Sequence, residues 1–131
     1  MPLGHLGVNV TDLAAAREYY DRLMPLLAYE PLMADGTQFA YRPRGGKVGT
    51  YLFFYPASEP GYSRTRVGLQ HLAFILPTRA DVDNVHARVS AHGDEIIHVP
   101  QEFPQYPPPY YATFWNGYDG VMLEAVCHKD L

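Results

Sequence analysis

The chain has 131 residues, of which 47% are hydrophobic and 18% charged, and this composition is typical of a globular protein rather than a disordered one. Its formal net charge of −4 argues against nucleic acid as a partner, because nucleic-acid-binding proteins usually present a basic surface. We expect no membrane span, no signal peptide and, with Cys127 as the single cysteine, no intrachain disulfide, so the expected location is the cytoplasm.

The first half of the chain predicts a strand, a helix and three further strands. Apolar residues fill 3–10, and Asp12 follows as a helix N-cap. Helical spacing continues to residue 28, but Pro25 predicts an end or a kink near Leu23, because proline has no backbone N–H to donate. The remaining strands are predicted from apolar and aromatic runs between turns, at 29–33, 38–42 and 48–55.

The second half repeats this order. A strand at 69–76 precedes Thr78, the predicted N-cap of a helix at 79–91 that Gly93 closes. Three strands again complete the half, at 95–99, 110–115 and 121–126.

Both halves therefore read β-α-β-β-β, and the polar segment 56–68 is the predicted linker between them. We predict an α+β fold in which residues 1–131 form a single domain of two βαβββ modules, 1–55 and 69–131. In such a duplication the curled mixed sheets of the two modules can face one another across a cleft.

A histidine occupies the same place in both halves. The sequence Gly-His-Leu at 4–6 is echoed by Gln-His-Leu at 70–72, so His5 and His71 lie 66 residues apart. A histidine that recurs at equivalent positions of a repeat suggests that each module contributes one imidazole to a shared site.

Glu124 is an acidic residue in the middle of an apolar strand. Aligning the last strands of the two modules places it over Phe53, at an offset of 71 because the second half has the longer loop. A carboxylate flanked by Leu123 and Ala125 is costly to bury unless it is paired or binds a metal.

His5, His71 and Glu124 together make two imidazoles and one carboxylate. This facial triad leaves coordination positions open and suits one divalent ion, namely Fe, Mn, Ni or Zn. Taken singly, each residue has a structural alternative, since a strand histidine is more often a hydrogen-bonded core residue and a strand glutamate more often faces solvent. The repeat symmetry favours the metal-binding interpretation.

Three stretches of the chain resemble the vicinal oxygen chelate superfamily, which includes glyoxalase I, extradiol dioxygenases and the bleomycin-binding resistance proteins. They are His-Leu-Gly-Val-Asn-Val-Thr-Asp-Leu from residue 5, Gln-His-Leu-Ala-Phe from residue 70, and Asp-Gly-Val-Met-Leu-Glu ending at residue 124. The resemblance implies paired βαβββ modules, a metal cleft with His5, His71 and Glu124 at the ligand positions, a small-molecule substrate and a homodimer. Fold alone does not determine the chemistry within so broad a superfamily.

Two enzymatic reactions stay open, because the chain departs from both patterns. Glyoxalase I usually has a fourth ligand, Glu or Gln, where this chain has Phe53, and that carboxylate can act as the proton-shuttling base of a lyase or isomerase. Extradiol dioxygenases use two His and one Glu at the triad positions, which fits better. However, Phe114 stands where that family has a catalytic tyrosine, and no histidine lies between His5 and His71.

A metal-free protein that sequesters a drug, as the bleomycin-binding proteins do, is the alternative function. The 11 tyrosines would suit an aromatic binding groove. The joint presence of His5, His71 and Glu124 would then be unexplained.

The remaining site residues are expected on weaker grounds. Aromatic side chains near the triad are expected to shape the substrate pocket, and they are Tyr51, Phe53, Tyr55 and Phe114. A basic region runs through the middle of the chain and comprises Arg42, Arg44, Lys47, Arg64 and Arg66. It either binds a carboxylate or phosphate of the substrate or forms a solvated loop surface, which is the commoner role of such charges.

Overall fold

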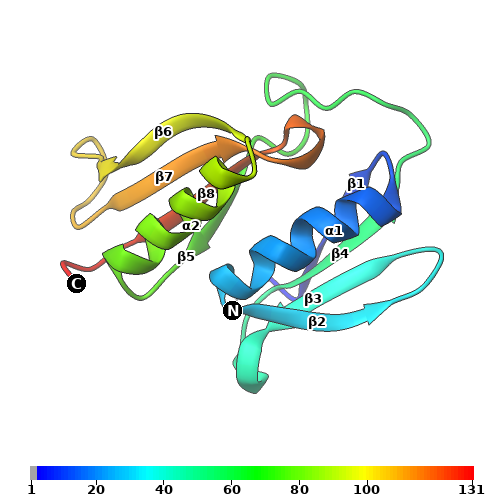
Figure 1. The fold of residues 1–131 in the computed structure, drawn as a ribbon, viewed down its shortest axis with the longest axis horizontal. Helices are drawn as coiled ribbons and strands as arrows, with labels where there is room; N and C mark the ends of the chain where they lie inside the picture. The colour runs from blue at the N-terminus through cyan, green and yellow to red at the C-terminus, as the bar shows by residue number, and fades with distance from the viewer. Residues whose placement is uncertain (1–2) are drawn as a thin grey trace. The chain divides into compact units, whose positions relative to one another are not determined.

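The computed structural model describes residues 3–131 and contains two four-stranded mixed sheets, one on each side of a division between Gly61 and Tyr62 (Figure 1). The strand order is β1-β4-β3-β2 in the first sheet and β5-β8-β7-β6 in the second. In each sheet the first two strands of this order are parallel and the other neighbours antiparallel. The predicted α+β fold of two βαβββ modules is confirmed.

The elements of the first unit follow the predicted order. They are β1 (His5–Val10), α1 (Leu13–Leu23), β2 (Tyr29–Ala34), β3 (Phe39–Pro43) and β4 (Tyr51–Pro56). Asp12 caps α1, since its carboxylate accepts the backbone N–H of Ala15 at 3.0 Å. The helix gives way to a 3₁₀ turn, Met24–Leu27, where Pro25 interrupts the α-helical hydrogen bonds.

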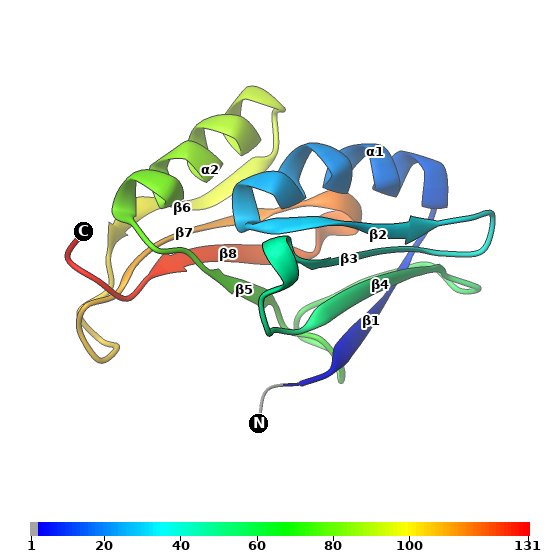
Figure 2. The same ribbon diagram turned by 90° about the horizontal axis from the view of Figure 1, so that it is seen from below.

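α1 covers one face of the first sheet (Figure 2). Its Tyr20 ring lies 4.4 Å from that of Phe54, which stacks on Phe39 at 4.8 Å, and all three side chains are buried. Residues alternate between the two faces of a strand. His5 and Phe53 therefore project from the face opposite the helix.

The second unit contains β5 (Leu72–Ile75), α2 (Arg79–Ala91), β6 (Glu95–Glu102), β7 (Tyr111–Asn116) and β8 (Met122–Cys127). β5 begins at Leu72, so His71 lies just before this strand rather than within it. β6 is longer than predicted and passes through Pro100. Because β6 is an edge strand with two register shifts, the missing N–H of proline breaks no regular ladder there.

α2 packs on the second sheet through valines spaced at helical intervals. Val82, Val85 and Val89 are fully buried, as are Trp115 and Leu123 on the strands beneath them. Figure 1 shows α2 running across this face of the sheet. Neither α1 nor α2, nor any other helix formed within residues 3–131, is long and apolar enough to cross a membrane.

Thr78 begins α2 with a reciprocal pair of hydrogen bonds. Its hydroxyl accepts the Asp81 backbone N–H at 3.1 Å, and the Asp81 carboxylate accepts the Thr78 backbone N–H at 3.2 Å. We expect Thr78→Ala to lower the free energy of unfolding by about 1 kcal/mol, measured by urea denaturation. Thr78→Ser keeps the hydroxyl and is the control. An alanine variant as stable as the wild type would contradict this role.

Candidate metal centre

The face of the second sheet opposite α2 carries an ordered row of side chains. In the strand register Ala73 is opposite Glu124, Glu124 is opposite Phe114, and Phe114 is opposite His98. Directly opposite residues share a face of the sheet. The ring of Phe114 lies 6.1 Å from that of His71 and 5.5 Å from that of His98.

Glu124 is the charged residue at the centre of this row. It is only 1% exposed, and each of its carboxylate oxygens has a partner. Oε1 lies 3.2 Å from Nε2 of His71, and Oε2 accepts the hydroxyl hydrogen of Tyr110 at 2.5 Å. A buried carboxylate is tolerated when its oxygens are satisfied in this way.

Gln70 contacts the ring nitrogen of His71 that does not face Glu124. The side-chain oxygen Oε1 of Gln70 bonds Nδ1 of the imidazole. In the tautomer that donates Nδ1–H to this oxygen, Nε2 carries the lone pair and presents it to the carboxylate. Two lone pairs facing each other repel unless a cation lies between them, whether a proton or a metal ion. Orientation of a ligand histidine by an acceptor on its other nitrogen is the common arrangement in metal sites. The donor set of His71 and Glu124 therefore fits a divalent ion.

His5 belongs to the first unit, where it has the position that His71 has in the second. Gly7 is opposite Phe53, as Ala73 is opposite Glu124, so the strand registers repeat with the offsets read from the sequence. The His5 ring lies 5.4 Å from that of Phe53, in an edge-to-face arrangement. The first unit thus has a ring contact where the second has an imidazole–carboxylate contact.

Two of the three predicted metal ligands lie in contact with each other. His71 and Glu124 are in contact. Across residues 3–131, no three side chains of His, Cys, Asp or Glu gather as a set that could hold a metal ion. The three-residue site with His5 stays a prediction.

The aromatic residues expected at the pocket divide between the units. Tyr51, Phe53 and Tyr55 alternate along β4, and the Phe53 and Tyr55 rings are nearly parallel at 6.4 Å. Phe114 is in the second unit, in an apolar cluster with Phe103, Ala112, Met122 and Val126.

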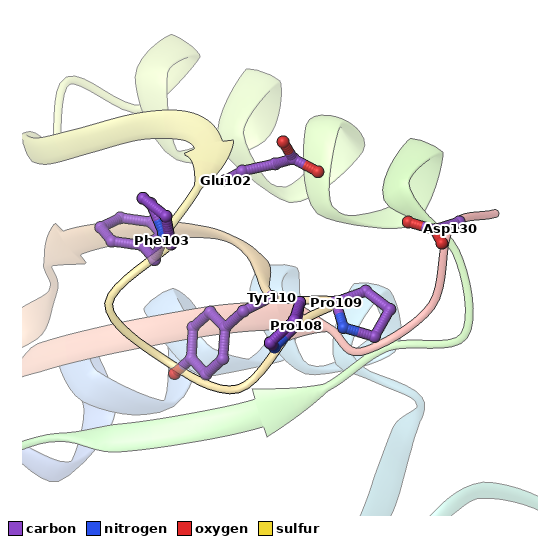
Figure 3. Close-up of a pocket in the computed structure, with 7 residues that line it drawn as sticks. Glu102, Phe103, Pro108, Pro109, Tyr110 and Asp130 are labelled. Atoms are coloured by element: carbon purple, nitrogen blue, oxygen red, sulfur yellow. The ribbon is translucent and has the colours of Figure 1, made fainter.

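Tyr110 is a residue that the sequence analysis missed. It stands at the end of the proline-rich loop, residues 103–110 between β6 and β7, and nothing in the sequence distinguishes it from the other tyrosines. Burial and the hydrogen bond to Glu124 raise the pKa of its phenol, so the hydroxyl stays protonated and acts as a donor. Its ring lines a pocket of about 270 Å³ together with Phe103 and the loop prolines, and its hydroxyl points away from Asp130 (Figure 3).

The basic region of the sequence separates into different environments. Arg42 forms an ion pair with Glu30 at 2.9 Å, and Arg44 donates to the carbonyl of Pro25. Arg64 belongs to the second unit, where its Nη1 lies 2.9 Å from the sulfur of Met122.

Two βαβββ modules in sequence, each with a four-stranded mixed sheet and one helix, define the class of fold. The model of the Glyoxalase/Bleomycin resistance protein/Dioxygenase superfamily matches residues 3–124, and the chain belongs to this superfamily. This confirms the resemblance seen in the sequence.

The chain is also similar to individual proteins along most of its length. YqjT, an uncharacterized protein of Bacillus subtilis strain 168, is 27% identical over 126 residues, which cover 93% of this chain and 95% of that protein. The crystal structure of a candidate glyoxalase from Bacillus halodurans superposes with a TM-score of 0.81 at 28% identity, covering 95% and 94% of the two chains. A glyoxylase/bleomycin resistance protein/dioxygenase domain from Frankia shares the fold, with a TM-score of 0.74, 21% identity and 98% coverage of both chains.

The Tyr110 hydroxyl is expected to stabilise the buried carboxylate. Tyr110→Phe removes the donor to Oε2 of Glu124, so the free energy of unfolding should fall by about 1–3 kcal/mol in chemical denaturation. Tyr106→Phe is the matched control, because its ring packs against Tyr110 at 4.7 Å while the partners of Glu124 stay in place. Equal stability of the two variants would show that the Tyr110 hydroxyl contributes nothing.

Proposed function

We propose that this protein is a divalent-metal-dependent enzyme whose small-molecule substrate presents two neighbouring oxygen atoms to the metal. The ligands in this proposal are His71 and Glu124 of the second module and His5 of the first. The observation that carries it is the 3.2 Å contact between Nε2 of His71 and Oε1 of the buried Glu124 carboxylate, with Gln70 on the other ring nitrogen, an arrangement that suits a cation shared by the two side chains.

Membership of the superfamily supports the proposal, and the repeated strand register supports His5 as the third ligand. The proposal makes residues 1–55 and 69–131 one functional domain joined by the linker 56–68. It also includes a homodimer, which sedimentation velocity would measure.

The chemistry that a divalent ion supplies when bound is Lewis acidity toward the substrate oxygens. The surrounding residues prepare that site. Tyr110 occupies Oε2 of Glu124 and leaves Oε1 directed at His71, while Gln70 holds the ring of His71. Phe114 lies opposite Glu124 in the strand register and adds apolar surface beside this almost fully buried carboxylate, where the lower dielectric strengthens its attraction for a cation.

Phe53 affects which reaction the site can catalyse, because its side chain can neither bind a metal nor transfer a proton. It offers no ligand atom, so three protein ligands leave positions for two substrate oxygens. It also offers no carboxylate base at this position.

Metal content tests the proposal. Protein purified without chelators should contain about one divalent ion per chain by elemental analysis. His5→Ala, His71→Ala and Glu124→Gln should each lose it. His98→Ala is the control, because this exposed histidine lies on the same sheet face outside the ligand set. A metal-free protein whose triad variants are unchanged in stability and ligand binding would instead support drug sequestration.

Activity assays on the metal-loaded protein separate the two reactions. We expect little isomerisation of a methylglyoxal–thiol adduct, because Phe53 cannot shuttle a proton. Catechols under oxygen test ring cleavage by oxygen uptake and product absorbance. Rapid isomerisation by the wild type would show that another residue serves as the base.

A further inference from the structure

Arg64 is a cation beside the candidate metal centre. Its Nη1 donates to the sulfur of Met122 at 2.9 Å. A thioether is a weak acceptor and a guanidinium has five N–H donors, so this contact leaves most of its hydrogen-bonding capacity for a ligand.

The position of Arg64 follows from the strand that it contacts. Met122 and Glu124 are two residues apart on β8, so their side chains share a face and lie about 7 Å apart along the strand. Met122 also belongs to the apolar cluster of Phe114. The guanidinium is therefore placed at the margin of the face that carries the His71–Glu124 pair.

The segment carrying Arg64 is hydrogen-bonded to Gln70, the residue next to His71. The Tyr62 hydroxyl donates to the backbone carbonyl of Gln70 at 2.8 Å, and the hydroxyls of Ser63 and Thr65 bond each other at 2.8 Å. Gln70 is also the residue that orients the ring of His71. One residue thus holds both the candidate ligand and the loop with the arginine.

Three other arginines have carboxylate partners that explain their positions. Arg17 pairs with Asp21, Arg42 with Glu30, and Arg79 with Glu102 and Asp130. None of the ion pairs formed within residues 3–131 includes Arg64.

We propose that Arg64 binds a carboxylate of the substrate, which makes the substrate an acid that also carries the two oxygens taken by the metal. The inference rests on the proposed function. A divalent ion with Glu124 as its single carboxylate ligand retains a positive charge, and Arg64 adds a second, so the site attracts an anion. The planar guanidinium matches a carboxylate with two parallel hydrogen bonds.

Binding of a charge series of catechols tests the proposal. Protein stripped of metal and reloaded with Zn²⁺ is titrated calorimetrically, without oxygen, with 3,4-dihydroxybenzoate, catechol and 2-(3,4-dihydroxyphenyl)ethylamine. The wild type should bind the carboxylate probe about tenfold or more tightly than catechol, and the amine most weakly.

Substitutions assign that preference to the arginine. Arg64→Gln should abolish the preference for the carboxylate probe and leave catechol affinity and Zn²⁺ content unchanged, while Arg64→Lys should retain part of it. Arg88→Gln, on the exposed side of α2, removes the same charge elsewhere and should keep the full preference.

Each result decides one of the two proposals. Zn²⁺ binding with no preference for the carboxylate, or with a preference unchanged in Arg64→Gln, overturns the role of Arg64 and leaves the metal proposal standing. Failure to bind Zn²⁺ overturns the metal proposal. In that case a preference for the carboxylate probe that depends on Arg64 still supports the anion position, and its absence overturns that too.

Discussion

The carboxylate of Glu124 lies in the middle of β8 with almost no exposure to solvent, where a charge without partners would be strongly destabilising. The surrounding structure satisfies both of its oxygens. Tyr110 reaches Oε2 from the end of the proline-rich loop, and His71 reaches Oε1 from the residue before β5. The need to stabilise one buried charge therefore joins three segments that are distant in the sequence.

The two modules share a backbone plan but present different chemistry at one pair of positions. The first strand begins at His5 in the first module and directly after His71 in the second, and each first strand pairs in parallel with the last strand of its module. At the equivalent position of the last strand, the first module has Phe53 and the second module has Glu124. The aromatic ring of Phe53 packs on His5, whereas Glu124 faces His71 as a potential ligand. A duplication with one carboxylate leaves a metal ion more open to substrate than one with two.

Net charge does not describe the electrostatics of such a site. The chain is acidic overall, yet the candidate centre combines a single carboxylate with an imidazole and has Arg64 at its margin. Fields near a ligand depend on which charges lie close by and how far they are desolvated. Arg64 contacts Met122 rather than an acidic side chain, so its positive charge is not neutralised by a carboxylate at this margin of the sheet face.

The sequence by itself determined the order of the elements, the duplication and the asymmetry between Phe53 and Glu124, because periodicity, helix caps and repeats are local properties of the chain. Thr78 and Pro25 act within a few residues of their own positions. Tertiary structure alone decided that β6 continues past Pro100, that Tyr110 reaches Glu124, and that the basic residues separate. These features depend on which strand lies at a sheet edge and on how loops cross it, and such long-range contacts leave no periodic signal in the sequence.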